Sequence, residues 1–232
     1  MSGFSCFVTG TDTGIGKTLV SCALIYAQAQ QGLRIAGMKP VAAGAAPYEG
    51  VWHNEDADAL ALASNMTLPP ELTTPYLLKT AAAPHIAAAL EHVAIDFTYI
   101  RACFQKIRAL ADAVVVEGVG GFRVPLTESL DSADLAVQFG LPVVLVVGMR
   151  LGCISQGLLT AEGIAARGLK LAGWVANCID PSMAYCAENI AALEKRLPAP
   201  LLGTIPYADS VSAAQAAAYL DFSALPGWPQ RH

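Results

Sequence analysis

Charged side chains are scarce in this chain of 232 residues. Asp, Glu, Lys and Arg together make up 14% of it, the formal net charge is -5, and no cluster of basic residues occurs. Nucleic-acid binding requires a basic patch, so we expect no nucleic-acid partner. Because 54% of the residues are hydrophobic, the composition indicates a folded protein rather than a disordered one. The partners expected on these grounds are small molecules.

Paired cysteines and long apolar runs are also missing. The 6 cysteines are scattered without the close spacing of a zinc site, and we expect neither disulfides nor zinc. The longest apolar run, Leu141 to Met149, is too short to cross a bilayer, and the N-terminus has no signal-peptide pattern. A cytoplasmic protein without membrane contact is therefore expected. The histidines show no catalytic or metal-ligand spacing and are assigned no role: His53, His85, His92 and His232.

Apolar strands are expected to alternate with helices along the chain. Strands are predicted at residues 4–9, 34–38, 113–116, 143–147, 171–176 and 201–205. Helices are predicted at residues 17–31, 57–63, 95–110, 132–139, 155–167 and 183–197. Several strands are unbroken apolar runs, which favours a parallel sheet covered by helices on both faces. We predict one α/β domain over residues 1–232 with a doubly wound, mostly parallel sheet, and the polar segment 43–84 as a lid or substrate-side excursion.

A glycine-rich loop lies between the first predicted strand and the first predicted helix. It reads Gly10-Thr11-Asp12-Thr13-Gly14-Ile15-Gly16-Lys17-Thr18. The backbone N–H groups of such a loop and the following helix N-terminus can bind phosphates, Lys17 would reach the β- and γ-phosphates, and Thr18 would bind Mg²⁺. Five residues separate Gly10 from Gly16, where the usual Walker pattern has four. A chance Gly-Lys-Thr in a turn is the alternative. The strand before and the helix after it favour a P-loop NTPase-like fold that uses ATP and Mg²⁺.

Two charged residues also follow predicted strands, and ligands of open parallel sheets bind beyond the carboxyl ends of the strands. Lys39 precedes Pro40 and is either a surface lysine or a cation that holds an anionic substrate; phosphoryl transfer favours the second interpretation. Glu117 ends an apolar run and is followed by glycines. Burying its charge is costly unless a cation such as Mg²⁺ satisfies it, and the alternative is an incidental acid in a glycine turn.

Two further segments each allow two interpretations. Asp56 and Asp58 open the short predicted helix, and either could bind the metal, although capping of the helix is the default interpretation. Gly152 to Ser155 leads into a predicted helix whose free N–H groups suit a carboxylate or a phosphate. Plain capping by Ser155 is the competing interpretation, and both can hold.

Together these motifs resemble the dethiobiotin synthetase family. The lengthened loop Gly-Thr-Asp-Thr-x-x-Gly-Lys-Thr is that family's own variant, so the departure from the Walker pattern supports the resemblance. The other matching segments are residues 37–42 (Gly-Met-Lys-Pro-Val-Ala), 116–121, 148–154, 171–177 and 198–203. The similarity runs from about Phe7 to Tyr207.

The resemblance implies a reaction and an assembly. It implies a homodimer of doubly wound subunits that joins 7,8-diaminononanoate with CO₂, using MgATP, to give dethiobiotin, ADP and phosphate. One amine would capture CO₂ as a carbamate, ATP would phosphorylate the carbamate to a carbamic-phosphoric anhydride, and the second amine would close the ring. The chain would then be an ATP-dependent carbon–nitrogen cyclo-ligase of biotin biosynthesis.

The resemblance also implies roles for individual residues. Lys39 would hold the carbamate and Lys17 would stabilise the transferring phosphoryl group. The metal ligands would be Thr18, Asp58 and Glu117, with Asp56 close enough to leave the register open. The implied ATP contacts are Thr13, Gly14, Ile15, Gly16, Lys17, Thr18, Leu19, Glu117, Gly118, Val119, Gly120, Asn177, Cys178, Pro206, Tyr207 and Ala208, the last five beside adenine. The implied substrate contacts are Thr11, Lys39, Ala43, Gly121, Gly152, Cys153 and Ser155. The last three would bind the distant carboxylate of the substrate that is held by the partner subunit.

Two residues depart from the family pattern. Ala43 stands where the family often has a small hydroxyl residue, and Cys178 replaces a frequent Asp beside Asn177, which leaves the substrate contact and the nucleotide preference open.

Two other activities compete with this interpretation. A cobyrinate-synthase type of amide-forming ATPase generally carries a glutaminase domain, for which this chain is expected to be too short. A partitioning-type ATPase switch, which acts through a protein partner, usually has a second lysine early in its phosphate loop. Here that position lies within Thr11-Asp12-Thr13.

Overall fold

A parallel sheet of 6 strands forms the centre of the fold in the computed structural model, which describes residues 3–229. Its strands are β1 (Cys6–Gly10), β2 (Ile35–Met38), β7 (Ala113–Glu117), β8 (Val143–Met149), β9 (Leu171–Cys178) and β10 (Leu201–Ile205). They lie in the order β10-β9-β8-β1-β7-β2, with every pair parallel. The consecutive strands β7 and β8 therefore lie on opposite sides of β1. The crevice beyond the carboxyl end of β1 is the switch point at which sheets of this kind bind ligands.

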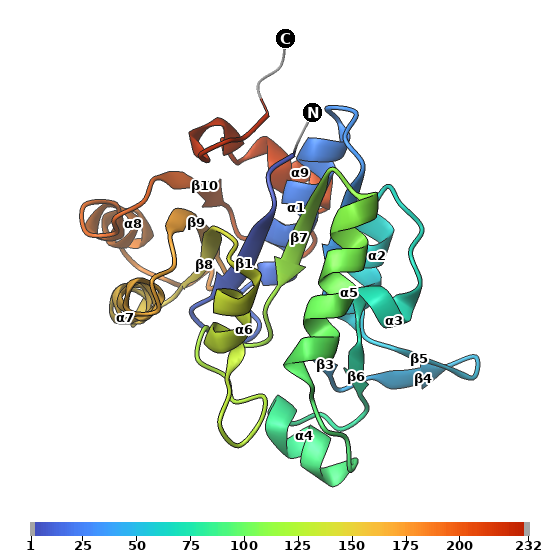
Figure 1. The fold of residues 1–232 in the computed structure, drawn as a ribbon. Helices are drawn as coiled ribbons and strands as arrows, with labels where there is room; N and C mark the ends of the chain where they lie inside the picture. Colours follow the sequence, from blue (N-terminus) through green and yellow to red (C-terminus); the bar gives the residue numbers. More distant parts are fainter. Residues whose placement is uncertain (1–2, 230–232) are drawn as a thin grey trace.

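Helices cover both faces of the sheet (Figure 1). On one face lie α1 (Lys17–Ala29), α2 (Glu55–Ala63) and α9 (Ala213–Ala218). On the other face lie α5 (Phe97–Leu110), α6 (Ser132–Phe139), α7 (Cys153–Ala166) and α8 (Cys186–Glu194). The short helix α4 (Pro84–Leu90) adds to the same core from below the sheet in Figure 1. Val115 of β7 packs on the first face, whereas Val114 and Val116 pack on the second. Since successive side chains of a strand point to opposite faces, a sheet covered on both sides needs unbroken apolar strands, and the predicted doubly wound fold is confirmed.

The segment between β2 and α5 is more structured than the sequence predicted. It contains β3 (Val41–Ala43), β4 (Ala46–Tyr48), β5 (Val51–His53), α3 (Pro70–Thr73) and β6 (Tyr76–Leu78). β3 pairs with β6 in parallel, and β4 and β5 form an antiparallel hairpin that projects from the molecule at the lower right of Figure 1. These strands have 3 residues each, too few for their sequence period to be recognised. The helix α4 was likewise not predicted.

Most other differences concern helix ends. α2 begins at Glu55 instead of residue 57 because the side chain of Asn54 accepts a hydrogen bond from the backbone N–H of Ala57 at 3.3 Å. α8 covers only Cys186–Glu194 of the predicted 183–197. Within residues 3–229 no helix combines the length and apolarity that a membrane crossing requires. His232, which was assigned no role, lies outside the described residues.

The cysteines lie apart from one another except for one pair. In the described part of the chain all of them are free, and four are buried. The Sγ atoms of Cys178 and Cys186 lie 3.7 Å apart. Burial, together with the neighbouring Cys186, raises the pKa of Cys178 to about 11, so its thiol is protonated and weakly nucleophilic at neutral pH.

Candidate functional site

A cavity of about 760 Å³ opens at the carboxyl ends of β1, β2 and β7. Its walls come from five parts of the chain: the phosphate loop, the end of β2 with β3, the start of α2, the segment that leads into α4, and the loop that follows β7. The lining residues are Thr13, Gly14, Gly16, Lys17, Thr18, Lys39, Ala42, Ala43, Asn54, Asp56, Ala81, Ala82, Ala83, Pro84, Val119, Gly120 and Val124. The cavity therefore lies at the predicted switch point.

The phosphate loop has the predicted context, with β1 before it and α1 beginning at Lys17. Gly14 and Gly16 have φ angles of 69° and 86°, a backbone region that glycine adopts without strain. The buried Ile15 anchors the loop, and the side-chain amide of Asn177 donates a hydrogen bond to its carbonyl oxygen at 2.8 Å. Asn177, at the carboxyl end of β9, thus fixes the loop from the neighbouring part of the sheet.

A matched pair of glycine substitutions tests this arrangement. A Cβ atom at Gly16 would lie 2.2 Å from Nδ2 of Asn177, whereas at Gly14 no described atom lies within 4 Å. Gly14→Ala should cost only the left-handed strain of about 1–2 kcal/mol in the free energy of unfolding. Gly16→Ala would also displace the side chain of Asn177. Its Kd for ATP, measured by calorimetric titration, should therefore rise about tenfold more than that of Gly14→Ala. Equal Kd values for the two variants would contradict the bracing role of Asn177.

Lys17 is buried beneath the loop. Its Nζ donates a hydrogen bond to the carbonyl oxygen of Asp12 at 2.8 Å. Burial, followed by the positive charge of Lys39, lowers the pKa of Lys17 to about 8, against the attraction of the nearby carboxylates. The carboxylate of Asp12 forms an ion pair with Arg150, which follows β8. An anionic ligand in the loop would stabilise the charged form of Lys17, which burial disfavours.

A buried lysine joins two carboxylates beside the loop. Nζ of Lys39 lies 2.6 Å from Oε1 of Glu117, 2.8 Å from Oδ2 of Asp56 and 3.1 Å from the carbonyl oxygen of Gly118. The side chains of Lys39 and Glu117 are 2% and 0% exposed. Burial alone would lower the pKa of Lys39, but attraction by Glu117 and then by Asp56 outweighs it, so the pKa lies above its usual value. Lys39 is therefore a charged residue of the crevice, not a surface lysine.

Oxygen atoms gather next to this ion pair. Oγ1 of Thr18 lies 2.6 Å from Oδ1 of Asp56 and 3.0 Å from Oε1 of Glu117. Oε2 of Glu117 is buried and has no hydrogen-bond partner among residues 3–229. Within the same residues no three His, Cys, Asp or Glu side chains form a metal-binding group of their own. Two carboxylates and a hydroxyl could hold Mg²⁺, which commonly takes one or two carboxylates and completes its shell with water and phosphate oxygens.

The structure places Asp58, the acidic residue of α2 expected in this cluster, away from it. Asp58 is 55% exposed and its Oδ2 lies 3.0 Å from Nδ1 of His53, on the hairpin side of the helix. Asp56 lies in the cluster instead. Residues two apart on a helix point in nearly opposite directions, so only one of them can face α1. Burial of Leu60, one turn after Asp56, fixes this phase, whereas Leu62, one turn after Asp58, is exposed. Because each Asp has a leucine four residues later, the sequence alone fits either phase.

Other predicted site residues lie outside this cavity. Gly152 and Ser155 are exposed at the start of α7, and Cys153 between them is buried. Pro206, Tyr207 and Ala208 are exposed beyond the end of β10. Leu19 lines a separate apolar cavity of about 390 Å³ with Cys22 and residues of α2. The structure does bring together Thr13, Gly14, Gly16, Lys17, Thr18, Lys39, Ala43, Val119 and Gly120.

Sequence reasoning missed several residues of the cavity wall. Residues 81–83 before α4, Pro84 at its start, and Val124 after β7 line the cavity but carry no charged or polar side chain. Thr11 was predicted to contact substrate; its Oγ1 is buried without a hydrogen-bond partner among the described residues. Gly121 packs against the loop, because a Cβ atom there would lie 3.7 Å from the carbonyl oxygen of Gly10.

Known proteins resemble the chain in sequence and in fold. A family model described as an AAA domain matches residues 5–215. The ATP-dependent dethiobiotin synthetase BioD of Janthinobacterium sp. (strain Marseille) is 59% identical over 231 residues, which cover 98% of each chain. The protein of the same name from Aromatoleum aromaticum is 58% identical over 95% of this chain and 97% of its own. The structure of a ParA family ATPase from Chlorobium tepidum TLS superposes with a TM-score of 0.55 at 13% identity, covers 96% of this chain and 94% of that one, and shares the fold alone. With such identity to two relatives over nearly its whole length, the chain belongs to the family of ATP-dependent dethiobiotin synthetases.

Proposed function

We propose that the chain converts 7,8-diaminononanoate, CO₂ and ATP into dethiobiotin, ADP and phosphate. The observation that carries this proposal is the buried Lys39, which lies between Glu117 and Asp56 at the edge of the phosphate loop. Such a cation is suited to hold an anionic group next to the transferring phosphate. A partitioning-type switch would need no second buried cation for a substrate, and the sequence relatives do not favour it.

The residues of the cavity divide the chemistry between them. The phosphate loop and Lys17 bind and orient the ATP phosphates, and Lys17 stabilises the charge that develops on transfer. Lys39 holds the carbamate formed from one substrate amine and CO₂, so that its oxygen faces the phosphate. Holding both groups in line supplies much of the rate enhancement, because phosphoryl transfer depends on position and charge stabilisation more than on covalent help from the protein.

Magnesium is the metal that fits the oxygen atoms of the cluster. We assign it to Thr18, Asp56 and Glu117, which present a hydroxyl and two carboxylates. Oε2 of Glu117, which has no hydrogen-bond partner among residues 3–229, is available as a metal ligand. When bound, Mg²⁺ would neutralise phosphate charge. Adenine is assigned to the region of Asn177, Cys178 and residues 206–208. Because Cys178 stands where the family often has Asp, the assay should also compare ATP with other nucleoside triphosphates.

The decisive experiment follows the product. Purified protein is incubated with MgATP, bicarbonate and 7,8-diaminononanoate, and dethiobiotin and ADP are quantified by mass spectrometry and by coupled assay. We expect dethiobiotin in equal amount to the ADP formed, and none when the diamine is omitted. ATP hydrolysis that continues without the diamine and yields no dethiobiotin would overturn the proposal in favour of a switch.

Ala43 allows a test of the substrate side of the cavity. It lines the cavity and is partly exposed, while the side chain of Asn54 donates a hydrogen bond to its carbonyl oxygen at 3.2 Å. Ala43→Ser places a hydroxyl where the family often has one. Because a neutral hydrogen bond contributes about 0.5–1.5 kcal/mol net, the KM for 7,8-diaminononanoate should fall by about two- to tenfold while the KM for ATP stays unchanged. A rise in the KM for the diamine would contradict a substrate contact at this position.

We also propose that the enzyme is a homodimer in which the start of α7 serves the partner's site. Leu151 is 94% exposed and, with Gly152 and Ser155, lies outside the cavity of its own chain. The start of a helix such as α7 has backbone N–H groups that suit the distant carboxylate of the diamine. Ser155→Glu would repel that carboxylate. If sites are shared, mixing equal amounts of Ser155→Glu and Lys39→Met subunits should restore about one quarter of wild-type activity, because half of the dimers are mixed and each mixed dimer has one intact site. If sites are not shared, the mixture should be no more active than the two variants measured separately.

A further inference from the structure

The chain after β7 forms one wall of the cavity. We call residues Gly118–Val124 the glycine segment; Val119, Gly120 and Val124 within it line the cavity. It lies close to the phosphate loop, because a Cβ atom at Gly120 would be 3.4 Å from Oγ1 of Thr13. The first residue of the segment is fixed by the sheet, since the N–H of Gly118 donates to the carbonyl oxygen of Val8 at 2.9 Å. The other end must be held by something outside the sheet.

Ser132, the first residue of α6, holds that other end. It is 2% exposed, and its Oγ donates a hydrogen bond to the carbonyl oxygen of Phe122 at 2.6 Å and accepts one from the N–H of Val124 at 3.1 Å. Its own N–H donates to the carbonyl oxygen of Val124 at 2.9 Å. The carbonyl oxygen of Gly121 lies 3.4 Å from the same Oγ. One buried hydroxyl therefore contacts three residues of the glycine segment.

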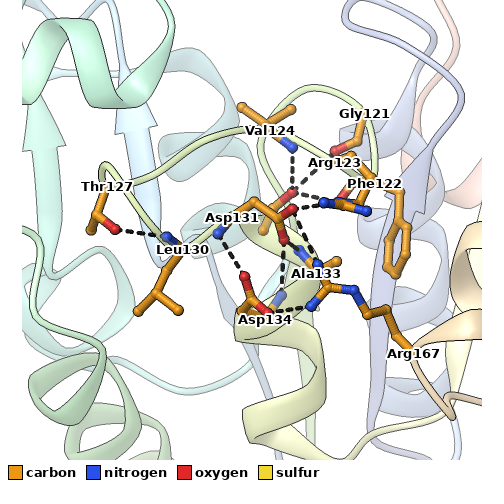
Figure 2. Close-up of polar contacts among 11 residues, drawn as sticks. Gly121, Phe122, Arg123, Val124, Thr127, Leu130, Asp131, Ala133, Asp134 and Arg167 are labelled. Carbon is orange, nitrogen blue, oxygen red and sulfur yellow. Dashed lines mark hydrogen bonds and ion pairs between the residues drawn. The ribbon is translucent and has the colours of Figure 1, made fainter.

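Ser132 is itself held by a network of charged side chains. Figure 2 shows Asp131 with the side chains of Arg123 and Arg167 directed towards it. The carboxylate of Asp131 accepts hydrogen bonds from the N–H groups of Ala133 and Asp134 at 2.9 and 3.1 Å, and Asp134 accepts one from the N–H of Asp131 at 2.9 Å. This reciprocal capping box fixes the first turn of α6. Arg167, which follows α7 and also pairs with Asp134, joins that turn to the neighbouring helix.

We propose that Ser132, fixed by Asp131, is a positioning residue for the reaction: it sets the distance between the glycine segment and the phosphate loop. This inference rests on the proposed function. Removing the hydroxyl would leave the carbonyl oxygen of Phe122 and the N–H of Val124 without their partner, so the segment would shift or fluctuate. A displacement of about 1 Å of a positioning element can lower a rate by about 100-fold.

The test compares Ser132→Ala with Thr127→Ala. Thr127 lies in the same loop, and its Oγ1 accepts hydrogen bonds from the N–H groups of Ser129 and Leu130, while no described contact joins that hydroxyl to the glycine segment. We expect Ser132→Ala to lower kcat by about tenfold or more, with amide hydrogen exchange accelerated at Val124, and Thr127→Ala to change kcat by less than about twofold. Ser132→Thr, which keeps the hydroxyl, should recover most of the loss.

A second variant guards against loss of folding. In Asp131→Asn the amide oxygen can still cap α6, but the charge that pairs with Arg123 and Arg167 is gone, so kcat should fall less than in Ser132→Ala and the exchange at Val124 should rise moderately. Unchanged kcat and unchanged exchange at Val124 in the folded variants would overturn the positioning role. Lack of dethiobiotin synthesis by the unaltered enzyme would instead overturn the proposed function, and the exchange at Val124 would still decide whether Ser132 holds the segment.

Discussion

Replacing Lys39 by methionine is expected to lower kcat by about 100- to 1,000-fold while the Kd for MgATP changes little. Lys39 faces the carboxylates and the cavity, and the phosphate loop makes its own contacts with the nucleotide. An interaction made with the carbamate and the transferring phosphate is strongest in the transition state, so its loss falls on kcat. Stopped-flow product formation and calorimetric titration with ATP measure the two quantities separately.

The same substitution should destabilise the folded protein. Glu117 is fully buried and would lose the ammonium group that lies 2.6 Å from its carboxylate, and breaking a buried pair from one side costs about 3–5 kcal/mol. Urea unfolding of Lys39→Met should show this loss at neutral pH. The double variant Lys39→Met/Glu117→Gln removes both charges and should regain part of the stability without regaining activity.

Two outcomes would contradict this account of Lys39. If the Kd for MgATP rises in proportion to the fall in kcat, Lys39 binds the nucleotide and not the carbamate. If Lys39→Met is as stable as the unaltered enzyme, the pair with Glu117 contributes less to the free energy of unfolding than its burial implies. The double variant tests the second point, because substitutions of two residues that interact give non-additive changes in the free energy of unfolding.

The sequence predicted the sheet and the loop because both depend on local pattern. Unbroken apolar strands, a glycine-rich turn and a helix start lie within a few residues of one another, and the extra residue of the loop distinguished the family. Lys39 and Glu117 were found because parallel strands bring their carboxyl ends to one edge. No contact between distant residues was needed for any of these predictions.

The parts that could not be predicted depend on contacts between distant segments. Asn177 was assigned to adenine, yet in the structure its amide also holds Ile15 of the phosphate loop, 162 residues away. Ser132 has no sequence signal beyond a helix start, and its role depends on where the glycine segment returns. Asp56 and Asp58 each have a leucine four residues later, and only packing in the structure shows that Leu60, not Leu62, is buried.

Glu117→Gln is expected to raise the Mg²⁺ concentration for half-maximal activity and to lower kcat by about 100-fold or more, since a catalytic metal ion contributes several kcal/mol. The substitution keeps the shape of the side chain and removes its charge. Asp56→Asn should act in the same direction, because both carboxylates adjoin Oγ1 of Thr18. Activity measured over a range of Mg²⁺ concentrations at saturating ATP gives both parameters.

Asp58→Asn is the matched control for the two carboxylates of the cluster. It removes the same charge two residues along α2 from a side chain that is 55% exposed and paired with His53. Its kcat and its Mg²⁺ dependence should stay within about twofold of the unaltered enzyme, as for surface substitutions in general. A strong effect at Asp58 with none at Asp56 would mean that α2 turns when the nucleotide binds. Loss at Glu117 and Asp56 alone would support assignment of the metal to the carboxylate that lies on the same face of α2 as the buried Leu60.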